Sequence, residues 1–589
     1  MLFGKLAEYY DRLEGVSSRL KMMEILSELF KEAGKKEVVE TVYMTQGTLL
    51  PPFEGLEFGV ADKLMEEAIA LATGYTKEQV HSEYKKAGDL GIAAQKLKQG
   101  TKLKQIVKND YSVKEVYEMM VKVARTSGQG SKDQKIGMLA NMIASASPLA
   151  AKYLVRYPLA NLRMGVGDST IMEALAIAYA GGRDAKEELE RAYNICSDLG
   201  EVGKAVAEGG MKEVGSMKVT LFKPVRPALA ERLPTAEQII ERLGGEVSVE
   251  QKYDGFRIQV HKKGKEVRLY SRRLENITEM FPDVIKAVNS ELDCDRIIFE
   301  GEALAYNEAT GEFLPFQETI QRKRKHGIEE KAMELPLHLF AFDILYYDGK
   351  DCLSKPYKER RELIERLFGK GKAIGPTRRI LTSKPKELEL FFEESIEGGL
   401  EGIMAKDLKS PYIAGARKFS WVKLKRSYKN KLSDTVDLVI VGYYLGRGSR
   451  AEFGFGGLLC AVYNDKRDVF ETVSRIGTGF TEKQMSELKS MLSKIKSSGK
   501  PARVEALVEP DFWVQPKYVV TINADEITRS PMHTCGKKDD KEGVGYALRF
   551  PRLYGGETVR GDKGPEDATT TKEIMEMFRM QKKVGLKES

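Results

Sequence analysis

The sequence predicts a multidomain protein with a helical first part, an α+β middle part and a β-rich last part. At 589 residues the chain is too long for one hydrophobic core and is expected to form roughly three to four domains. Up to about residue 220, apolar residues recur at helical spacing. The proline-containing segment Phe222–Pro227 then marks a boundary, after which strand-like runs alternate with shorter helices. Toward the end, short β-type runs dominate.

The composition is that of a soluble globular protein, with 42% hydrophobic and 31% charged residues. Lys and Arg total 95 against 87 Asp and Glu, and a net charge of +8 is weak evidence for nucleic acid unless the cations cluster. No run approaches about 18 uncharged apolar residues, so no membrane span is expected. Met1–Lys5 opens an amphipathic helix rather than a signal peptide.

The five cysteines lie far apart and form no Cys-x-x-Cys pair, which argues against a zinc ribbon or a disulfide framework. Free thiols fit a reduced, intracellular compartment, and we expect a cytoplasmic protein. The cysteines are Cys196, Cys294, Cys352, Cys460 and Cys535.

In the first part, helices are predicted at Ser18–Phe30 and at Asp62–Ala72, the second ending near Gly74 as a C-cap. Residues 95–108 are rich in lysine and form either a solvated linker or a segment that a partner protein binds. A further helix is expected to start at Ile171.

Asp168 or Ser169 would cap that helix, and its N-terminus next to Arg163 is a natural site for a phosphate. Gly165 and Gly167 are not a dinucleotide fingerprint, because no strand precedes them and the third glycine is absent.

The middle part alternates strands and helices and contains no P-loop, so a bound nucleotide would need another device. We expect an α/β or α+β domain of about 200 residues. The predicted strands lie within 249–260, 267–270, 297–306, 337–347 and 402–405, and the predicted helices at 281–290, 358–368 and 385–397.

The last part predicts about five strands in roughly 130 residues, which suits a small Greek-key β-barrel of the OB type, a frequent nucleic-acid binder. Thr571–Lys583 forms a final amphipathic, basic helix. The predicted strands are 436–444, 457–463, 469–474, 504–508 and 514–522.

Lys252 lies at a charged, glycine-containing bend between two strands of the middle part, at the edge of a possible pocket. A lysine can be a nucleophile if burial or neighbouring cations lower its pKa. By itself this pattern more often describes a surface lysine in a hairpin.

Further charged side chains lie at or within the apolar strands of the middle part. A buried charge costs several kcal/mol unless it is paired or meets a ligand. One such residue is commonly a structural ion pair, whereas six sites with both signs indicate a polar pocket. Carboxylates there could hold Mg²⁺, cations could neutralise phosphates and an aromatic ring could stack on a base. The sites are Glu250 with Lys252, Ser271–Arg273, Glu302, Phe342 with Asp343, Glu401, and Lys423 with Lys425.

In this order the motifs resemble those of covalent nucleotidyltransferases, and most closely the archaeal type of ATP-dependent DNA ligase. The resemblance covers nearly the whole chain, including Leu162–Gly165, Ala547–Arg552 and Val559–Lys563. Single motifs are weak, but six or more in order are specific. Those of the middle part are Lys252–Arg257, Ser271–Arg273, Phe299–Glu302, Phe340–Asp343, Glu401–Lys406 and Trp421–Lys425.

The resemblance implies a helical DNA-binding domain at 1–220, a nucleotidyltransferase (adenylation) domain at 221–426 and an OB-fold domain with a C-terminal helix at 427–589. It implies a monomer that seals nicks between a 5′-phosphate and a 3′-hydroxyl in duplex DNA, in replication, repair and recombination. The reaction would use ATP and Mg²⁺ or Mn²⁺, and the protein would associate with the nucleoid.

By the same resemblance, Lys252 attacks the α-phosphate of ATP and becomes a lysine–AMP adduct, from which AMP passes to the DNA 5′-phosphate. Glu250 would contact the adenine amino group and Phe342 would stack on the ring. Both Glu302 and Glu401 are candidate metal ligands. The other roles are ribose and phosphate contacts for Arg257, Arg272 and Glu302, α-phosphate contacts for Arg417, Lys423 and Lys425, and pyrophosphate orientation by Arg549 and Lys563.

Some alternatives stay open. RNA ligation or mRNA capping would share the lysine and the pocket but not the large helical domain, and a nick-binding protein with a degenerate pocket belongs to a different class. The family often recruits a sliding clamp through a glutamine and an aromatic pair, but Gln105–Tyr111 lacks the pair. The final helix either docks on the middle domain or is a solvated end. The sequence does not reveal whether ADP, GTP or NAD can be used, or how the domains are arranged.

Overall fold

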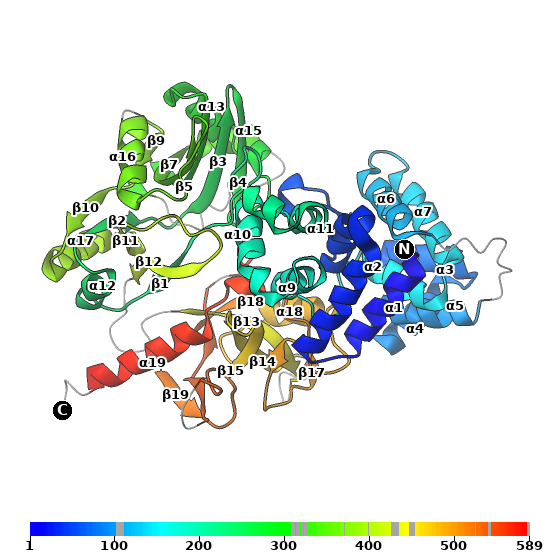
Figure 1. Cartoon of the computed structure of the whole chain (residues 1–589). Coiled ribbons are helices and arrows are strands. Elements are labelled where there is room, and N and C mark those ends of the chain that lie inside the picture. Colours follow the sequence, from blue (N-terminus) through cyan, green and yellow to red (C-terminus); the bar gives the residue numbers. More distant parts are fainter. Residues whose placement is uncertain are drawn as a thin grey trace.

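The computed structural model of the chain consists of three groups of elements that follow one another along the sequence (Figure 1). The structure describes residues 1–101, 111–307, 312–313, 319, 322, 328–369, 371–397, 400–425, 435–446, 454–524, 526–539, 543–555 and 557–585. Most of the predicted clamp-binding segment, Gln105 to Asp110, lies outside the described residues.

The first group is helical, and its apolar faces meet in one core. The predicted helix at Ser18–Phe30 lies within α2, which continues to Gln46 after a bend at Gly34, where φ is 60°. The predicted helix at Asp62–Ala72 is confirmed as α3, followed by Gly74 in the left-handed conformation. The helices are α1 (Phe3–Glu14), α2 (Arg19–Gln46), α3 (Asp62–Thr73), α4 (Lys77–Ala87), α5 (Leu90–Gln99), α6 (Val113–Arg125), α7 (Ser131–Ser145), α8 (Pro148–Arg156), α9 (Asp168–Tyr179), α10 (Lys186–Cys196) and α11 (Leu199–Ser216).

A new helix, α9, begins after the glycines as expected, but its predicted cap is wrong. The N-cap residue is Gly167, and no side chain caps the helix. The Asp168 carboxylate instead accepts hydrogen bonds from Gln46 at 2.8 Å and from Tyr193 at 2.6 Å. Asp168 therefore ties α9 to neighbouring helices.

The middle group contains two sheets, with strand orders β1-β12-β11-β2-β10 and β4-β3-β5-β7-β8. The predicted bend at Lys252 is confirmed, since β2 ends at Lys252 and β3 starts at Phe256 in the other sheet. The elements are β1 (Leu229–Arg232), α12 (Ala236–Leu243), β2 (Val247–Lys252), β3 (Phe256–Lys263), β4 (Glu266–Ser271), α13 (Pro282–Glu291), β5 (Arg296–Asn307), β6 (Glu312–Phe313), α15 (Ile328–Glu334), β7 (Leu337–Tyr347), β8 (Lys350–Asp351), α16 (Tyr357–Phe368), β9 (Ile374–Pro376), β10 (Arg379–Thr382), α17 (Pro385–Glu397), β11 (Gly402–Asp407) and β12 (Arg417–Lys425).

The first of these sheets has one apolar and one polar face. Residues opposite one another in antiparallel strands share a face, and alternate residues point to opposite faces. Val249, Ile403 and Val422 share a buried cluster with residues of α12 and α17. The polar face carries three rows across β2, β11 and β12: Ser248, Lys406 and Trp421; Glu250, Met404 and Lys423; Lys252, Gly402 and Lys425.

The last group is built on a sheet with the order β16-β15-β14-β13-β18-β21, in which β17 also pairs with β13. A barrel of the OB type stays a prediction. The elements are β13 (Val436–Tyr444), β14 (Gly457–Asn464), β15 (Val469–Ile476), α18 (Glu482–Ser493), β16 (Val504–Glu505), β17 (Phe512–Trp513), β18 (Val519–Asn523), β19 (Glu526–Ser530), β20 (Gly545–Arg549), β21 (Arg552–Leu553) and α19 (Thr571–Gly585).

Two strand predictions in this group need correction. The run at 504–508 is a strand only over Val504–Glu505. The run at 514–522 is not one strand, because β17 ends at Trp513 and β18 starts at Val519. Pro516 lies between them and has no amide N–H to donate to a sheet, which explains the interruption.

The final helix, α19 (red in Figure 1), lies beside the middle group rather than free in solvent. Lys572 pairs with Glu231 of β1 at 3.1 Å, and Glu573 pairs with Arg417 of β12. Of the two interpretations left open by the sequence, docking is therefore the correct one. Over the described residues, we find no helix with both the length and the apolar character needed to cross a membrane.

Candidate functional site

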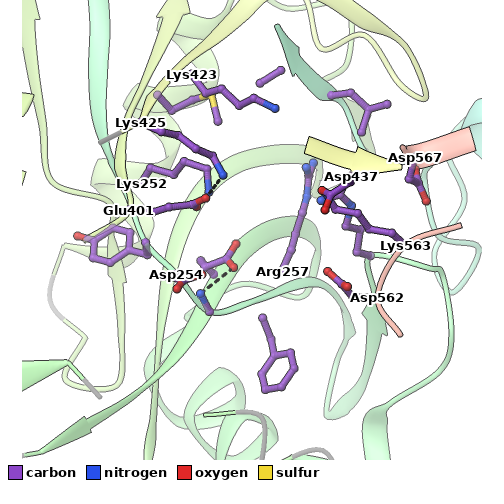
Figure 2. Close-up of a pocket in the computed structure, with 18 of the residues that line it drawn as sticks. Lys252, Asp254, Arg257, Glu401, Lys423, Lys425, Asp437, Asp562, Lys563 and Asp567 are labelled. Carbon is purple, nitrogen blue, oxygen red and sulfur yellow. Dashed lines mark hydrogen bonds and ion pairs between the residues drawn. The ribbon is translucent and has the colours of Figure 1, made fainter. Parts of the chain in front are cut away.

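A cavity of about 1340 Å³ lies between the middle and last groups. Residues from both sheets of the middle group line it, together with the segment that follows β21. In Figure 2, Lys252, Glu401 and Lys425 gather on one side, and Asp437 and Lys563 lie across from them. Charges of both signs therefore converge on one space, as the sequence led us to expect.

Lys252 is the last residue of β2, and its ammonium group pairs with the Glu401 carboxylate. The same carboxylate pairs with Lys425, so it lies between the two ammonium groups. Lys252, Gly402 and Lys425 form one row of the sheet, and Glu401 precedes that row directly. The position of all three charges is thus set by backbone pairing.

Glycine is required at two points next to Lys252. A Cβ at Gly255 would lie 2.3 Å from the carbonyl oxygen of Ala303, so the bend can only approach β5 without a side chain. Gly402 has a φ of 149°, and a Cβ there would lie 2.1 Å from the carbonyl oxygen of Leu424. These glycines let the strands around the lysine pack closely.

Burial lowers the pKa of Lys252 from its ordinary value of 10.5, and the charge of Lys425 lowers it further. Glu302 and Asp254 act in the opposite direction. Burial also raises the pKa of Glu302, whose Oε1 accepts a hydrogen bond from the Gly255 amide at 3.2 Å. The environment therefore favours an uncharged amine, which is the form that can act as a nucleophile.

Phe342 and Arg257 lie together on the wall of the cavity. The guanidinium carbon of Arg257 is 5.2 Å from the centre of the Phe342 ring, which also contacts Trp421 edge-on at 5.9 Å. Arg257 Nη2 donates to Glu300 at 2.8 Å, and Nη1 donates to the Ala228 carbonyl at 2.9 Å. Arg257 thus lines the site as expected, but its charge is already neutralised and its guanidinium is held in place.

Arg272 also lines the cavity. Its Nε is buried and has no hydrogen-bond partner among the described residues. An unsatisfied guanidinium donor beside a cavity fits an anionic ligand.

Arg417 and Lys423, both on β12, line the cavity and meet a carboxylate from α19. Arg417 pairs with Glu573, and Lys423 Nζ lies 3.8 Å from the same carboxylate. Glu573 is buried, and although burial alone would raise its pKa, Arg417 and Lys423 lower it to about 2. An ionised carboxylate therefore lies against two of the three cations that are expected to contact the α-phosphate.

The two residues expected from the last group are placed differently. Lys563 lies in the cavity and pairs with Asp437 of β13. Arg549 is exposed at the end of β20, its guanidinium carbon is 5.5 Å from the Phe550 ring, and it does not line the cavity. Arg549 therefore lies outside the cavity in this arrangement, because β19 and β20 form a separate two-stranded sheet, and its role after a domain movement stays a prediction.

Arg163 is also engaged with other residues of the chain, and its expected role in DNA binding stays a prediction. Its Nε lies 3.0 Å from Asp89 Oδ2, its Nη2 donates to the Gly88 carbonyl at 3.3 Å, and its side chain is only 9% exposed. Burial lowers the pKa of Arg163, against the effect of Asp89. The guanidinium is thus engaged with the segment before α5 and does not lie free at the start of α9.

No group of three or more His, Cys, Asp or Glu side chains in the described parts of the chain could hold a metal ion. Mg²⁺ needs only one or two protein carboxylates when phosphate oxygens and water complete its shell. Glu401 has the oxygen donors for this, although it is paired with two lysines. Glu302 fits less well, because burial favours its protonated form.

Sequence reasoning missed several charged residues of the cavity, and four of them bear on the chemistry. Arg560 and Asp437 come from the last group, and Arg560 lies within a motif whose lysine alone was singled out. Lys406 ends the motif that begins with Glu401, where only the glutamate was selected. Glu573 lies in the final helix, and its sequence surroundings gave no signal of a distant partner.

A lysine driven toward its neutral form, carboxylates and a set of cations around one cavity define an enzyme site for a polyphosphate. Three family models match the chain in order. They are "DNA ligase N terminus" over residues 2–176, "ATP dependent DNA ligase domain" over residues 227–425 and "ATP dependent DNA ligase C terminal region" over residues 451–563.

Relatives match over the full length of the chain. A "Probable DNA ligase" of Dictyoglomus turgidum is 50% identical over 588 residues, covering 100% of this chain and 99% of that protein. A "DNA ligase" of Staphylothermus marinus is 44% identical over 597 residues, covering 99% of each. The solved structure "mycobacterial DNA ligase D complexed with ATP and MES" is 24% identical, with a TM-score of 0.34, and the match covers 58% of this chain and 97% of that one. The chain belongs to the ATP-dependent DNA ligase family.

Proposed function

We propose that this DNA ligase seals nicks in duplex DNA through a covalent lysine–AMP intermediate on Lys252. The observation that carries the proposal is a partly buried lysine, 24% exposed, whose pKa is lowered and which lies next to cations on the same sheet face. Sealing of this kind would serve replication, repair and recombination.

In the first step the neutral Nζ of Lys252 attacks the α-phosphorus of ATP. A nitrogen–phosphorus bond forms, the bond from that phosphorus to the bridging oxygen of pyrophosphate breaks, and the amine loses its proton. The DNA 5′-phosphate then attacks the same phosphorus and releases the lysine. Attack by the 3′-hydroxyl on the activated 5′-phosphate closes the strand and expels AMP. Each step depends on positioning and charge neutralisation.

We assign the remaining residues by their place around the cavity. Glu250 and Phe342 would bind adenine, and Glu302 the ribose. The cations on β12, Arg417, Lys423 and Lys425, would hold the α-phosphate, and Arg272 would bind a phosphate through its unsatisfied donor. Lys563 would orient the pyrophosphate, and Arg549 would reach the site only after the last group moves.

Mg²⁺ or Mn²⁺ would bind at Glu401, with Glu302 as the second candidate. When bound, the ion would withdraw charge from the phosphate oxygens. For this, Glu401 would leave one of its two lysines, and that lysine would become available to phosphate.

We further propose that the domains divide at 1–220, 221–426 and 427–589, that the last is an OB-fold domain and that the protein acts as a monomer. The family matches, which cover 2–176, 227–425 and 451–563, are compatible with these borders. The helical domain would bind nicked DNA mainly through phosphates, so affinity should fall steeply with salt.

Mass spectrometry tests the proposal directly. The protein mixed with ATP and Mg²⁺ is expected to gain the mass of one AMP on the peptide that contains Lys252, and to lose it when nicked DNA is added. Absence of this mass gain in a protein that seals nicks would exclude the lysine intermediate.

Replacing Lys425 with methionine is expected to move the pH profile of AMP transfer to higher pH. Only the neutral Lys252 amine attacks, so the rate rises as pH passes through its pKa. Lys425 lowers that pKa, and its removal should shift the midpoint upward by about one unit. The midpoint is read from single-turnover AMP labelling, which separates it from any loss of phosphate binding. The matched control is Lys418→Met on the exposed side of the same strand, and an unchanged midpoint in Lys425→Met would contradict the assignment.

Replacing Glu573 with glutamine is expected to lower the KM for ATP in AMP transfer roughly three- to tenfold. The phosphate must displace an ionised carboxylate from Arg417, and a neutral amide competes less strongly. Glutamine still accepts the hydrogen bond from the Thr570 amide at the helix start. Glu576→Gln, one turn further along α19, is the control. An unchanged or higher KM in Glu573→Gln would show that this contact does not compete with ATP.

A further inference from the structure

Lys406 is a buried cation that the proposed reaction has not used. It is 1% exposed, it lies in the sheet row next to that of Glu250, and it faces the same cavity. Three rings surround its ammonium group, with Trp421 at 4.4 Å, Tyr357 at 4.6 Å and Phe342 at 5.1 Å from ring centre to Nζ. A buried charge costs free energy unless it is paired with an opposite charge, hydrogen-bonded or placed over aromatic rings.

The ammonium group of Lys406 contacts both residues that are proposed to bind adenine. Its Nζ lies 3.0 Å from Glu250 Oε2 and donates to the Phe342 carbonyl oxygen at 2.8 Å. It also lies 3.3 Å from the Tyr357 hydroxyl, which donates to Glu250 Oε1. One cation thus fixes the carboxylate and the backbone of the stacking residue together.

Among the described residues, the groups within hydrogen-bond distance of the Glu250 side chain are all donors. Thr377 donates to Oε2 at 2.9 Å, Ser248 donates to Oε1 at 3.3 Å, and Tyr357 donates to Oε1. A carboxylate surrounded by donors is held ionised, and an ionised carboxylate can only accept hydrogen bonds. Although burial alone would raise the pKa of Glu250, the nearby charges of Lys406 and Arg361 lower it.

We propose that Lys406 is a positioning residue that makes the site selective for a purine with a 6-amino group, by keeping Glu250 an obligate acceptor. The inference rests on the proposed function, and it identifies the 6-amino group as the part of the nucleotide that the site recognises. Adenine offers an N–H donor at position 6, whereas hypoxanthine and guanine offer a carbonyl oxygen, which a carboxylate repels. Without the cation, Glu250 can hold a proton and donate it to that oxygen.

Arg361 does not replace Lys406 in this role. Its Nη1 lies 3.7 Å from Glu250 Oε1 and donates to the Thr377 hydroxyl at 2.7 Å, while its Nε donates to Glu365 at 3.2 Å. Arg361 therefore makes the longer of the two ion pairs with Glu250, and its guanidinium is shared with other partners. Lys406 makes the closer ion pair and donates a hydrogen bond to the Phe342 carbonyl oxygen as well.

The test compares AMP and IMP transfer to the full chain from ATP and from inosine triphosphate, whose base has a carbonyl oxygen in place of the 6-amino group and a proton on N1. For Lys406→Met, kcat/KM with ATP is expected to fall about 100-fold through KM, while that with inosine triphosphate changes less than about threefold. The preference for ATP therefore falls at least about tenfold. Lys409→Met, an exposed lysine just after β11, is the control and keeps the wild-type preference.

A second variant keeps the test decisive if Lys406→Met does not fold. Glu250→Gln carries an amide that can donate to a 6-carbonyl, so the preference for ATP is expected to fall at least about tenfold in this variant as well. In the Glu250→Gln background, Lys406→Met should change the preference no further, because the lysine acts through the carboxylate.

Equal losses with both nucleotides in Lys406→Met, or an unchanged preference in Glu250→Gln, would overturn the proposal. Either result would leave the lysine–AMP mechanism intact as long as the wild-type protein is labelled on Lys252. Absence of label in the wild type would instead reject the proposed function itself.

Discussion

Replacing Lys252 with alanine is expected to reduce AMP labelling of the protein by at least about 10⁴-fold, while nicked DNA still binds with nearly wild-type affinity. The amine supplies the only bond that the protein would form to phosphorus. Lys425 lies on the same sheet row and its pKa is lowered to about 8, mainly by burial, but its proposed role is to hold the α-phosphate rather than to attack it. Intact-mass measurement reports the label, and an electrophoretic mobility shift with a nicked duplex reports binding.

The control for this variant is Lys263→Ala, which removes an exposed lysine at the far end of β3 and should leave labelling unchanged. DNA affinity should persist because it depends on many phosphate contacts, most of them outside the cavity. Labelling of Lys252→Ala at a rate comparable to the wild type would refute the assignment of the nucleophile.

Replacing Arg360 with methionine is expected to destabilise the middle domain by about 3–5 kcal/mol. Arg360 and Asp343 form an ion pair with both side chains 0% exposed, with Nε 2.7 Å from Oδ1 and Nη2 3.2 Å from Oδ2. Removal of the guanidinium leaves a carboxylate buried without its cation. For a domain of this size, the loss corresponds to a fall in melting temperature of roughly 10 °C, measured by calorimetry.

Two comparisons make the stability result specific. Lys384→Met breaks an exposed pair with Glu387, whose side chains are 74% and 46% exposed, and should cost less than about 1 kcal/mol. The double variant Asp343→Leu with Arg360→Met removes both charges and should recover much of the loss. A single variant no less stable than Lys384→Met would mean that the buried pair does not hold β7 to α16.

The middle group was predictable because its signals are strong and local. Long apolar runs gave β5 and β7, the glycine-containing bend gave the end of β2, and periodicity gave α17 with its observed bounds. The cavity residues could be collected because a charge within an apolar strand demands a partner or a ligand. Where the local signal was weak, the prediction failed, as at Pro516, which divides what resembled one strand.

Contacts between distant segments were not predictable. The contact between Lys406 and Glu250 depends on the register of β2 and β11, which places Lys406 in the row next to that of Glu250. Glu573 meets Arg417 because α19 docks on the middle group, and no motif encodes that docking. The position of Arg549 outside the cavity was not predictable for the same reason, since the order of motifs along a chain does not fix how separate domains face one another.

Glu250 and Lys252 are two residues apart on the same face of one strand, so β2 would set a spacing of about 6.6 Å between the residue proposed to bind the nucleobase and the residue proposed to attack phosphorus. This spacing can change only in whole residues. Deleting Gln251 would turn the amine toward α12 and α17, into hydrocarbon, whereas lengthening the strand by a full pleat would restore its direction but overshoot the phosphate.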